Sequence, residues 1–125
     1  MNPVTWFEVY VADMERAAKF YENVFKTKLN IMQTPESAGD LEMRGFNGNM
    51  SGYGANGALV KMPGFPTGKN SVLVYFECQD CQVEEKRVTE FGGKVEKKKF
   101  SIGQYGFISI VYDTEGNMIG LHSMK

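Results

Sequence analysis

The sequence predicts an α+β protein built from two copies of a strand–helix–strand–strand–strand unit. Residues 6–13 alternate between apolar and polar side chains, end on an Asp and precede an amphipathic helix pattern, and residues 73–80 repeat this order. A shift of 67 residues takes Asp13 to Asp80. Three extended segments follow each helix pattern. Because a duplicated unit forms two related sheets, we expect the two sheets to close around a shared cleft.

Length and composition predict one domain. The 125 residues are too few for two independent cores, and 42% hydrophobic residues are enough for one. The net charge of −1 gives no electrostatic footprint for nucleic acid or for an anionic membrane. No apolar run approaches the ~20 residues of a membrane helix, and no basic-apolar leader opens the chain. We therefore expect a cytoplasmic protein with no nucleic-acid or membrane partner.

The first unit is expected over about residues 1–62. Its first strand covers 4–11 and places Trp6, Glu8 and Tyr10 on one face. Asp13 is a typical helix N-cap. The buried stripe of the helix is predicted to comprise Met14, Ala17, Ala18, Tyr21, Val24 and Phe25. Three further strands are expected over 29–34, 40–46 and 58–62.

The second unit, about 71–125, follows a Pro- and Gly-rich hinge over 63–70. Its first strand covers 72–78, and Asp80 caps a helix that Gly92-Gly93 ends. The apolar residues of this helix are Val83, Val88 and Phe91. Three strands are expected over 94–100, 107–112 and 118–123, and a turn at 113–117 joins the last two.

The order of these motifs resembles the vicinal oxygen chelate superfamily, which includes glyoxalases, bleomycin-resistance proteins and extradiol dioxygenases. The matching pieces are Asp13 with Ala18 and Phe20-Tyr21, Gly92-Gly93-Lys94-Val95, Tyr105-Gly106, and Asp113-x-x-Gly116-Asn117-x-Ile119. They span nearly the whole chain. The resemblance implies two βαβββ modules whose curved mixed sheets enclose a small-molecule cavity, commonly in a homodimer.

Superfamily members with metal chemistry carry His, Gln or Glu at four strand positions. Trp6, Leu73 and Gly120 stand at three of these positions, and the fourth falls on Leu59 or Lys61. None is a good ligand, so we expect no metal and no other cofactor. The alternative is a displaced metal site at Glu8, Glu77 and His122, each two residues further along its strand. Such a site lies about 6.5 Å away, at another depth of the cleft.

The repeat also predicts a polar aromatic pocket. The 67-residue shift takes Glu8 to Tyr75 and Tyr10 to Glu77, so each module contributes one Glu and one Tyr. Facing a cleft, these pairs suit a cationic or hydroxylated ligand, and phenol–carboxylate hydrogen bonds would satisfy both groups when the cleft is empty. On a solvated face the pairs would only stabilise the sheet. The aromatic residues favour the cleft. The ligand-binding candidates are Trp6, Glu8, Tyr10, Leu73, Tyr75, Glu77, Tyr105 and His122.

These features predict a cytoplasmic, dimeric glyoxalase/bleomycin-resistance-like protein that binds a small organic molecule without the superfamily metal. A first alternative is a lyase or isomerase in which His122 works with Glu8 or Glu77 as acid and base. His122 is the only histidine, and Gly120 beside it would leave space above the sheet. A second alternative is a non-catalytic interaction module. The sequence leaves open whether the cleft joins two modules of one chain or of two exchanged chains.

One further motif is discounted. Cys78-Gln79-Asp80-Cys81 has the spacing of a redox pair, but Cys78 falls at a strand end. The Asp80 carboxylate would raise the pKa of a nearby thiol rather than lower it. We interpret the spacing as a coincidence.

Overall fold

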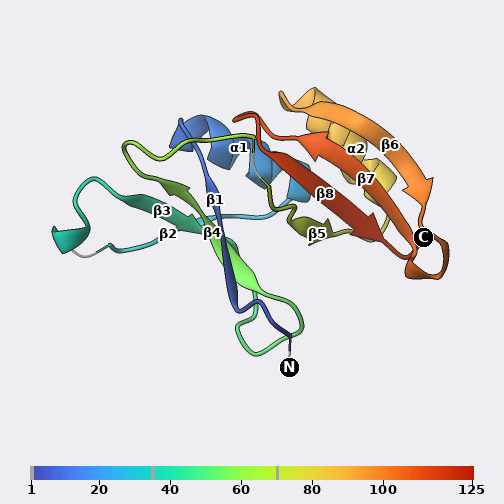
Figure 1. The fold of residues 1–125 in the computed structure, drawn as a ribbon, viewed down its shortest axis with the longest axis horizontal. Helices are drawn as coiled ribbons and strands as arrows, with labels where there is room; N and C mark the ends of the chain where they lie inside the picture. The colour runs from blue at the N-terminus through green and yellow to red at the C-terminus, as the bar shows by residue number, and fades with distance from the viewer. Residues whose placement is uncertain (1, 35, 70) are drawn as a thin grey trace.

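The computed structural model of the chain describes residues 2–34, 36–69 and 71–125, and it contains two four-stranded mixed sheets (Figure 1). The first module comprises β1 (Trp6–Tyr10), α1 (Met14–Phe25), β2 (Asn30–Ile31), the short 3-10 helix η1 (Glu36–Ala38), β3 (Glu42–Gly45) and β4 (Asn56–Lys61). The second comprises β5 (Tyr75–Glu77), α2 (Cys81–Glu90), β6 (Lys94–Ser101), η2 (Gly103–Tyr105), β7 (Phe107–Tyr112) and β8 (Met118–Ser123). The predicted α+β class and the βαβββ order are confirmed.

Both sheets have the same topology. Their strand orders are β1-β4-β3-β2 and β5-β8-β7-β6, in which the first pair is parallel and the others are antiparallel. The two sheets lie side by side in Figure 1 and stay open, without a ladder between them. The expected closure of the sheets around a shared cleft is therefore not present within the described parts of one chain.

Both helices begin as predicted. The Asp13 carboxylate accepts a hydrogen bond from the Arg16 amide, and the Asp80 carboxylate accepts one from the Gln82 amide, each at 3.0 Å. The predicted stripe of α1 is confirmed, with Phe20 also buried and Phe25 partly exposed.

The predicted apolar face of α2 is wrong at Val83, whose side chain is 45% exposed. Glu85 takes the inward position instead. Its carboxylate accepts hydrogen bonds from the Lys99 amide and the Ser109 hydroxyl, each at 2.6 Å. These bonds compensate for the loss of water around a buried charge.

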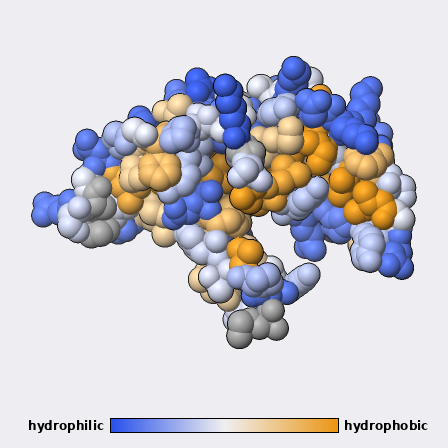
Figure 2. Space-filling model, in the orientation of Figure 1, coloured by the Kyte–Doolittle hydropathy of each residue, from blue (hydrophilic) through white to orange (hydrophobic). Residues whose placement is uncertain are grey.

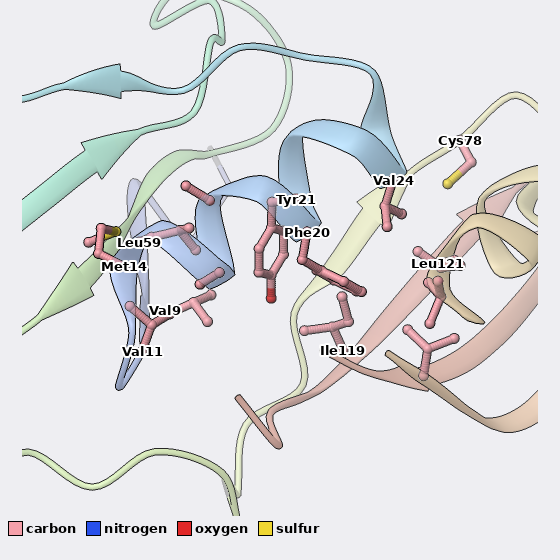
Figure 3. Close-up of a cluster of buried hydrophobic side chains, with 14 of the residues drawn as sticks. Val9, Val11, Met14, Phe20, Tyr21, Val24, Leu59, Cys78, Ile119 and Leu121 are labelled. Atoms are coloured by element: carbon pink, nitrogen blue, oxygen red, sulfur yellow. The ribbon is translucent and has the colours of Figure 1, made fainter. Parts of the chain in front are cut away.

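One hydrophobic core joins the two modules. Figure 3 shows Phe20, Tyr21 and Val24 of α1 lying close to Ile119 and Leu121 of β8. An aromatic cluster continues this core between the modules: the Phe76 ring of β5 stacks on Phe25 at 4.7 Å and meets Phe7 edge-on at 5.8 Å. Packing of this kind holds the second module against α1.

The face of each sheet away from the core carries the predicted site residues that lie in strands; Leu73 and Tyr105 lie outside the strands. In β1, Phe7 and Val9 pack into or against the core, so Trp6, Glu8 and Tyr10 lie on the other face. On the side shown in Figure 2, hydrophobic side chains gather over the second sheet, and the surface is hollowed beside it.

Among the described residues, no helix is long and apolar enough to cross a membrane.

Candidate ligand-binding site

A cavity of about 420 Å³ lies where the two modules meet. β1 contributes Glu8 and Tyr10 to its wall, and β8 contributes Met118 and Ile119. The segment that connects the modules supplies most of the remaining wall. The other lining residues are Val9, Phe65, Pro66, Gly68, Lys69, Ser71, Val72, Val74 and Asn117. Residues 65–69 of the predicted hinge therefore contribute a wall of the cavity.

Glu8 is held by both of its neighbours on the same strand face. The Tyr10 hydroxyl donates to Glu8 Oε1 at 2.8 Å, and Trp6 Nε1 donates to Glu8 Oε2 at 3.1 Å. Burial raises the pKa of Tyr10, and the hydrogen bond and negative charge of Glu8 raise it further. The phenol therefore stays protonated and keeps donating to Glu8. The predicted phenol–carboxylate bond is present in the first module.

The connecting segment places an aromatic ring against Tyr10. The rings of Tyr10 and Phe65 stack with their centroids 4.4 Å apart and their planes 15° apart. A turn positions Phe65: its amide donates to the Met62 carbonyl at 3.1 Å, and Gly64 has a φ of 84°. A left-handed residue after a Pro is typical of a type II turn, and only glycine adopts it without strain.

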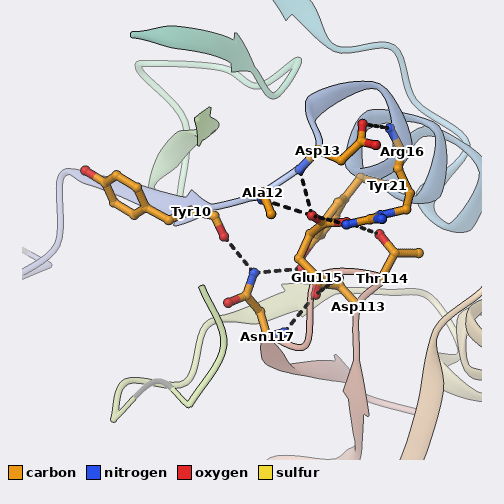
Figure 4. A network of polar contacts seen from close by, with 9 residues as sticks. All are labelled: Tyr10, Ala12, Asp13, Arg16, Tyr21, Asp113, Thr114, Glu115 and Asn117. Atoms are coloured by element: carbon orange, nitrogen blue, oxygen red, sulfur yellow. Dashed lines mark hydrogen bonds and ion pairs between the residues drawn. The ribbon is translucent and has the colours of Figure 1, made fainter. Parts of the chain in front are cut away.

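A buried polar network fixes this junction of the modules (Figure 4). Glu115 accepts hydrogen bonds from the amides of Ala12 and Asp13, each at 2.9 Å, and from Arg16 Nε at 2.7 Å. Burial by itself raises the pKa of Glu115, but the hydrogen bonds from Arg16 and the two amides outweigh it and hold the pKa at about 2. The carboxylate therefore stays ionised although its side chain is fully buried.

Asn117 and Asp113 complete the network. The Asn117 amide nitrogen donates to the Tyr10 carbonyl at 2.9 Å, and its oxygen accepts from the Gly68 amide at 2.8 Å. Burial raises the pKa of Asp113, although the hydrogen bonds from Tyr21 and Asn117 act to lower it. The sequence predicted only a turn here. The polar residues of 113–117 were a signal for such a network, but their partners in the first module lie about 100 residues away.

Glu77 and His122 lie at a different place. They line an open hollow beside the C-terminal residues, together with Cys78, Gln79, Ser123, Met124 and Lys125. His122 Nε2 lies 2.6 Å from the carbonyl oxygen of Tyr105, so the imidazole has a backbone partner. Within residues 2–34, 36–69 and 71–125, no three His, Cys, Asp or Glu side chains are grouped so that they could hold a metal ion. One chain therefore does not assemble the displaced site of Glu8, Glu77 and His122.

The space predicted above Gly120 is filled. A Cβ atom at Gly120 would lie 2.3 Å from Cδ1 of Tyr75, because the Tyr75 ring covers this glycine. Of the eight predicted ligand-binding residues, Glu8 and Tyr10 line the cavity between the modules, and Glu77 and His122 line the open hollow. Trp6 does not line the cavity, but it donates a hydrogen bond to Glu8, which does. Leu73, Tyr75 and Tyr105 line neither space.

The strand register settles the fourth superfamily metal position. Glu8 pairs with Ala58, and Tyr75, its counterpart after the 67-residue shift, pairs with Gly120. Ala58 is therefore the counterpart of Gly120. The expectation of Leu59 or Lys61 was wrong because both lie on the opposite face of β4. Trp6, Ala58, Leu73 and Gly120 offer no side-chain metal ligand, so these residues do not fit the metal of the superfamily.

Comparisons with known proteins agree with this fold. The family model of the Glyoxalase/Bleomycin resistance protein/Dioxygenase superfamily matches residues 4–121. The chain is 29% identical over 118 residues to proteins named "Putative glyoxylase CFP32" from Mycobacterium bovis and Mycobacterium tuberculosis. The match covers 93% of this chain and 43% of those proteins, so the chain spans less than half of their length.

Solved structures resemble the whole chain. TnmS3, an antibiotic binding protein from Streptomyces sp. CB03234, is 25% identical with a TM-score of 0.63, and the match covers 98% of this chain and 96% of TnmS3. The trypanothione-dependent glyoxalase I of Leishmania major has a TM-score of 0.73 at 15% identity, with coverage of 99% and 88%. Glyoxalase I of Zea mays has a TM-score of 0.71 at 20% identity, with coverage of 98% and 46%. The chain belongs to the Glyoxalase/Bleomycin resistance protein/Dioxygenase superfamily.

Proposed function

We propose that the protein binds a small organic molecule in the cavity between its modules, without the metal of the superfamily. The observation that carries this proposal is the Glu8 carboxylate, held by Trp6 and Tyr10 at a cavity with apolar and aromatic walls. The volume of about 420 Å³ falls within the range of small-molecule sites, which favours a binding protein over an interaction module whose cleft is filled.

The chemistry of the cavity supports an amine or a hydroxylated ligand. Among the described residues, each Glu8 oxygen accepts one hydrogen bond, and a carboxylate oxygen has a second lone pair that a donor on the ligand could use. Val72, Val74 and Ile119 supply apolar surface around this acceptor. A ligand with one donor group and an apolar body matches both features. The antibiotic-binding relative TnmS3, matched over nearly its full length, supports the same class of function.

Trp6 provides the test, because it is the only tryptophan of the chain and it contacts Glu8. Fluorescence and calorimetric titrations would use organic amines and phenols, including metal-free bleomycin. We expect at least one compound to bind and to change the Trp6 emission. Glu8→Gln should weaken that binding by about ten-fold, the scale of a hydrogen bond to a charged group. The exposed Glu96→Gln is the matched control. Binding that Glu8→Gln leaves unchanged would contradict the proposed site.

The absence of the metal is tested separately. Calorimetric titration with Ni²⁺, Zn²⁺ and Mn²⁺ is expected to reveal no stoichiometric site, since Trp6, Ala58, Leu73 and Gly120 occupy the ligand positions. Binding of one tight equivalent of any of these ions would overturn this part of the proposal.

A glyoxalase-like lyase or isomerase is the second candidate, because the relatives matched at 29% identity carry a glyoxylase name. Glu77 and His122 pair across β5 and β8, and they would supply the base and the acid. The test is turnover of the methylglyoxal–glutathione adduct, followed by NMR with and without a chelator. Turnover that survives the chelator and disappears in His122→Gln would establish the enzyme; we expect none.

We also infer that the protein is a homodimer, as the open sheet faces and the superfamily suggest. Light scattering should then give twice the chain mass of 14.0 kDa. A cytoplasmic location remains the expectation from the sequence.

A further inference from the structure

We propose that the Phe65 side chain is a gate. Its ring covers the face of the Tyr10 ring on which a planar aromatic ring of the ligand would stack. The inference rests on the proposed binding function of the cavity and adds two elements to it. One is the class of ligand, a planar aromatic molecule with an adjacent hydrogen-bond donor. The other is the step that admits it, rotation of one side chain of the connecting segment.

The first evidence is the geometry of the two rings. A centroid distance of 4.4 Å with planes 15° apart is the parallel stacking that Tyr10 would also make with a planar ligand. Both side chains line the cavity. Phe65 is 49% exposed, and Tyr10 is its only ring partner among the described residues. The half-exposed Phe65 ring thus lies on the ring surface that a planar ligand would need.

The second evidence is the fixed backbone on both sides of Phe65. Its own amide bonds to the Met62 carbonyl, and three residues later the Gly68 amide bonds to Asn117 Oδ1 at 2.8 Å. A Cβ atom at Gly68 would lie 3.0 Å from the Gly116 carbonyl oxygen, so this attachment is close. Rotation of the Phe65 side chain uncovers Tyr10 and breaks none of these bonds.

The class of ligand follows from the position of Glu8. The Tyr10 hydroxyl donates to Glu8 at 2.8 Å, so a ring stacked on Tyr10 brings its own substituents near the same carboxylate. An amine or hydroxyl on that ring would donate to Glu8, whereas an anionic substituent would be repelled. The site should therefore select planar rings with a donor over planar anions and over flexible amines.

Calorimetry of the full chain with three probes separates the contribution of the planar ring from that of the hydrogen-bond donor. Proflavine combines a planar ring with amine donors, naphthalene-2-sulfonate has the ring with a negative charge, and spermidine has amines without a ring. The variants are Phe65→Ala, Phe65→Leu, Tyr10→Leu and Glu8→Gln. Tyr53→Ala is the matched control, because Tyr53 is 89% exposed and lies outside the cavity. Thermal unfolding of each variant verifies that it folds.

We expect proflavine to bind Phe65→Ala roughly 2- to 10-fold more tightly than the wild type, because no ring pair must be broken first. The affinity of Phe65→Leu for proflavine should lie between those of Phe65→Ala and the wild type. Tyr10→Leu and Glu8→Gln should bind proflavine more weakly than the wild type, and Tyr53→Ala should bind it equally well. The two other probes should bind more weakly than proflavine to the wild type and to both Phe65 variants, which keep Tyr10 and Glu8.

Weaker or equal binding of proflavine by Phe65→Ala would overturn the gate, and the proposed binding function would stand with Phe65 as a wall. Equal binding of naphthalene-2-sulfonate and proflavine would overturn the proposed ligand class. If proflavine fails to bind every variant while another compound binds and responds to Glu8→Gln, the inference alone fails. If no compound binds the wild type or Phe65→Ala, the proposed function fails with it.

Discussion

Arg16 and Glu115, 99 residues apart in sequence, form a two-point ion pair, with Nε–Oε2 at 2.7 Å and Nη2–Oε1 at 2.9 Å. Arg16 belongs to the first turn of α1, and Glu115 to the turn between β7 and β8. The same carboxylate accepts hydrogen bonds from the amides of Ala12 and Asp13. It therefore fixes the end of β1, which carries Tyr10, against the second module.

Glu115→Gln should lower the free energy of unfolding by about 2–3 kcal/mol, because the amide cannot accept the same set of charged and backbone donors. Urea unfolding followed by circular dichroism measures the change. Glu96→Gln, at an exposed position of β6, is the matched control and should change it little. A loss below about 0.5 kcal/mol for Glu115→Gln would show that the pair contributes little to stability.

The same residue predicts acid sensitivity. The folded-state pKa of Glu115 is about 2, below its ordinary value of 4.5. A lowered pKa stabilises the fold fully above the ordinary value, and this contribution is lost as the pH falls towards the folded pKa. The raised pKa of Asp113 has the opposite sign and offsets part of the loss.

We therefore expect the unfolding free energy to fall between about pH 5 and pH 2, and to fall less in Glu115→Gln. Urea unfolding over this pH range measures both. Parallel curves for the wild type and the variant would contradict the assignment of this loss to Glu115.

Gly120→Ala should destabilise the protein, since its Cβ would lie 2.3 Å from the Tyr75 ring. The Tyr75 ring must move or the backbone must distort, and either change is expected to lower the free energy of unfolding by about 1–3 kcal/mol. Tyr75→Ala removes the obstacle, so the double variant should lose less stability than the sum of the single ones. Thermal unfolding of the four proteins measures this. Additive losses would mean that Tyr75 does not cover Gly120 in solution.

The two cysteines should be unreactive in the folded protein. Both side chains are buried and free. Burial raises the pKa of the Cys78 thiol, and the negative charge of Glu84, rather than the Asp80 predicted from the sequence, raises it further. A thiol with a raised pKa presents little thiolate.

A thiol-reactive disulfide reagent should therefore label neither cysteine in buffer and both in concentrated guanidinium chloride. Absorbance of the released chromophore counts the labelled thiols. Fast labelling of one cysteine in the folded protein would contradict this prediction and show that its thiol is accessible and reactive.

The sequence by itself determined the order and kind of the elements. β7 and β8 cover the predicted ranges, and both predicted Asp caps bond to the first turns of their helices. Alternation, capping and turn residues act over a few positions, so a short window of sequence contains all the information they need. The same short range explains why the carboxylate–phenol bond of Glu8 and Tyr10, two residues apart, was predictable.

Only the tertiary structure decided which of these residues form the site. Residues 65–69 contribute a wall of the cavity because Asn117 bonds to Gly68, and Phe65 covers Tyr10. Glu8 lies apart from Glu77 and His122 because the two sheets stay open. Each of these facts depends on contacts between distant residues and on how side chains fill space. Local sequence patterns do not encode such contacts, which arise only when the modules pack around their shared core.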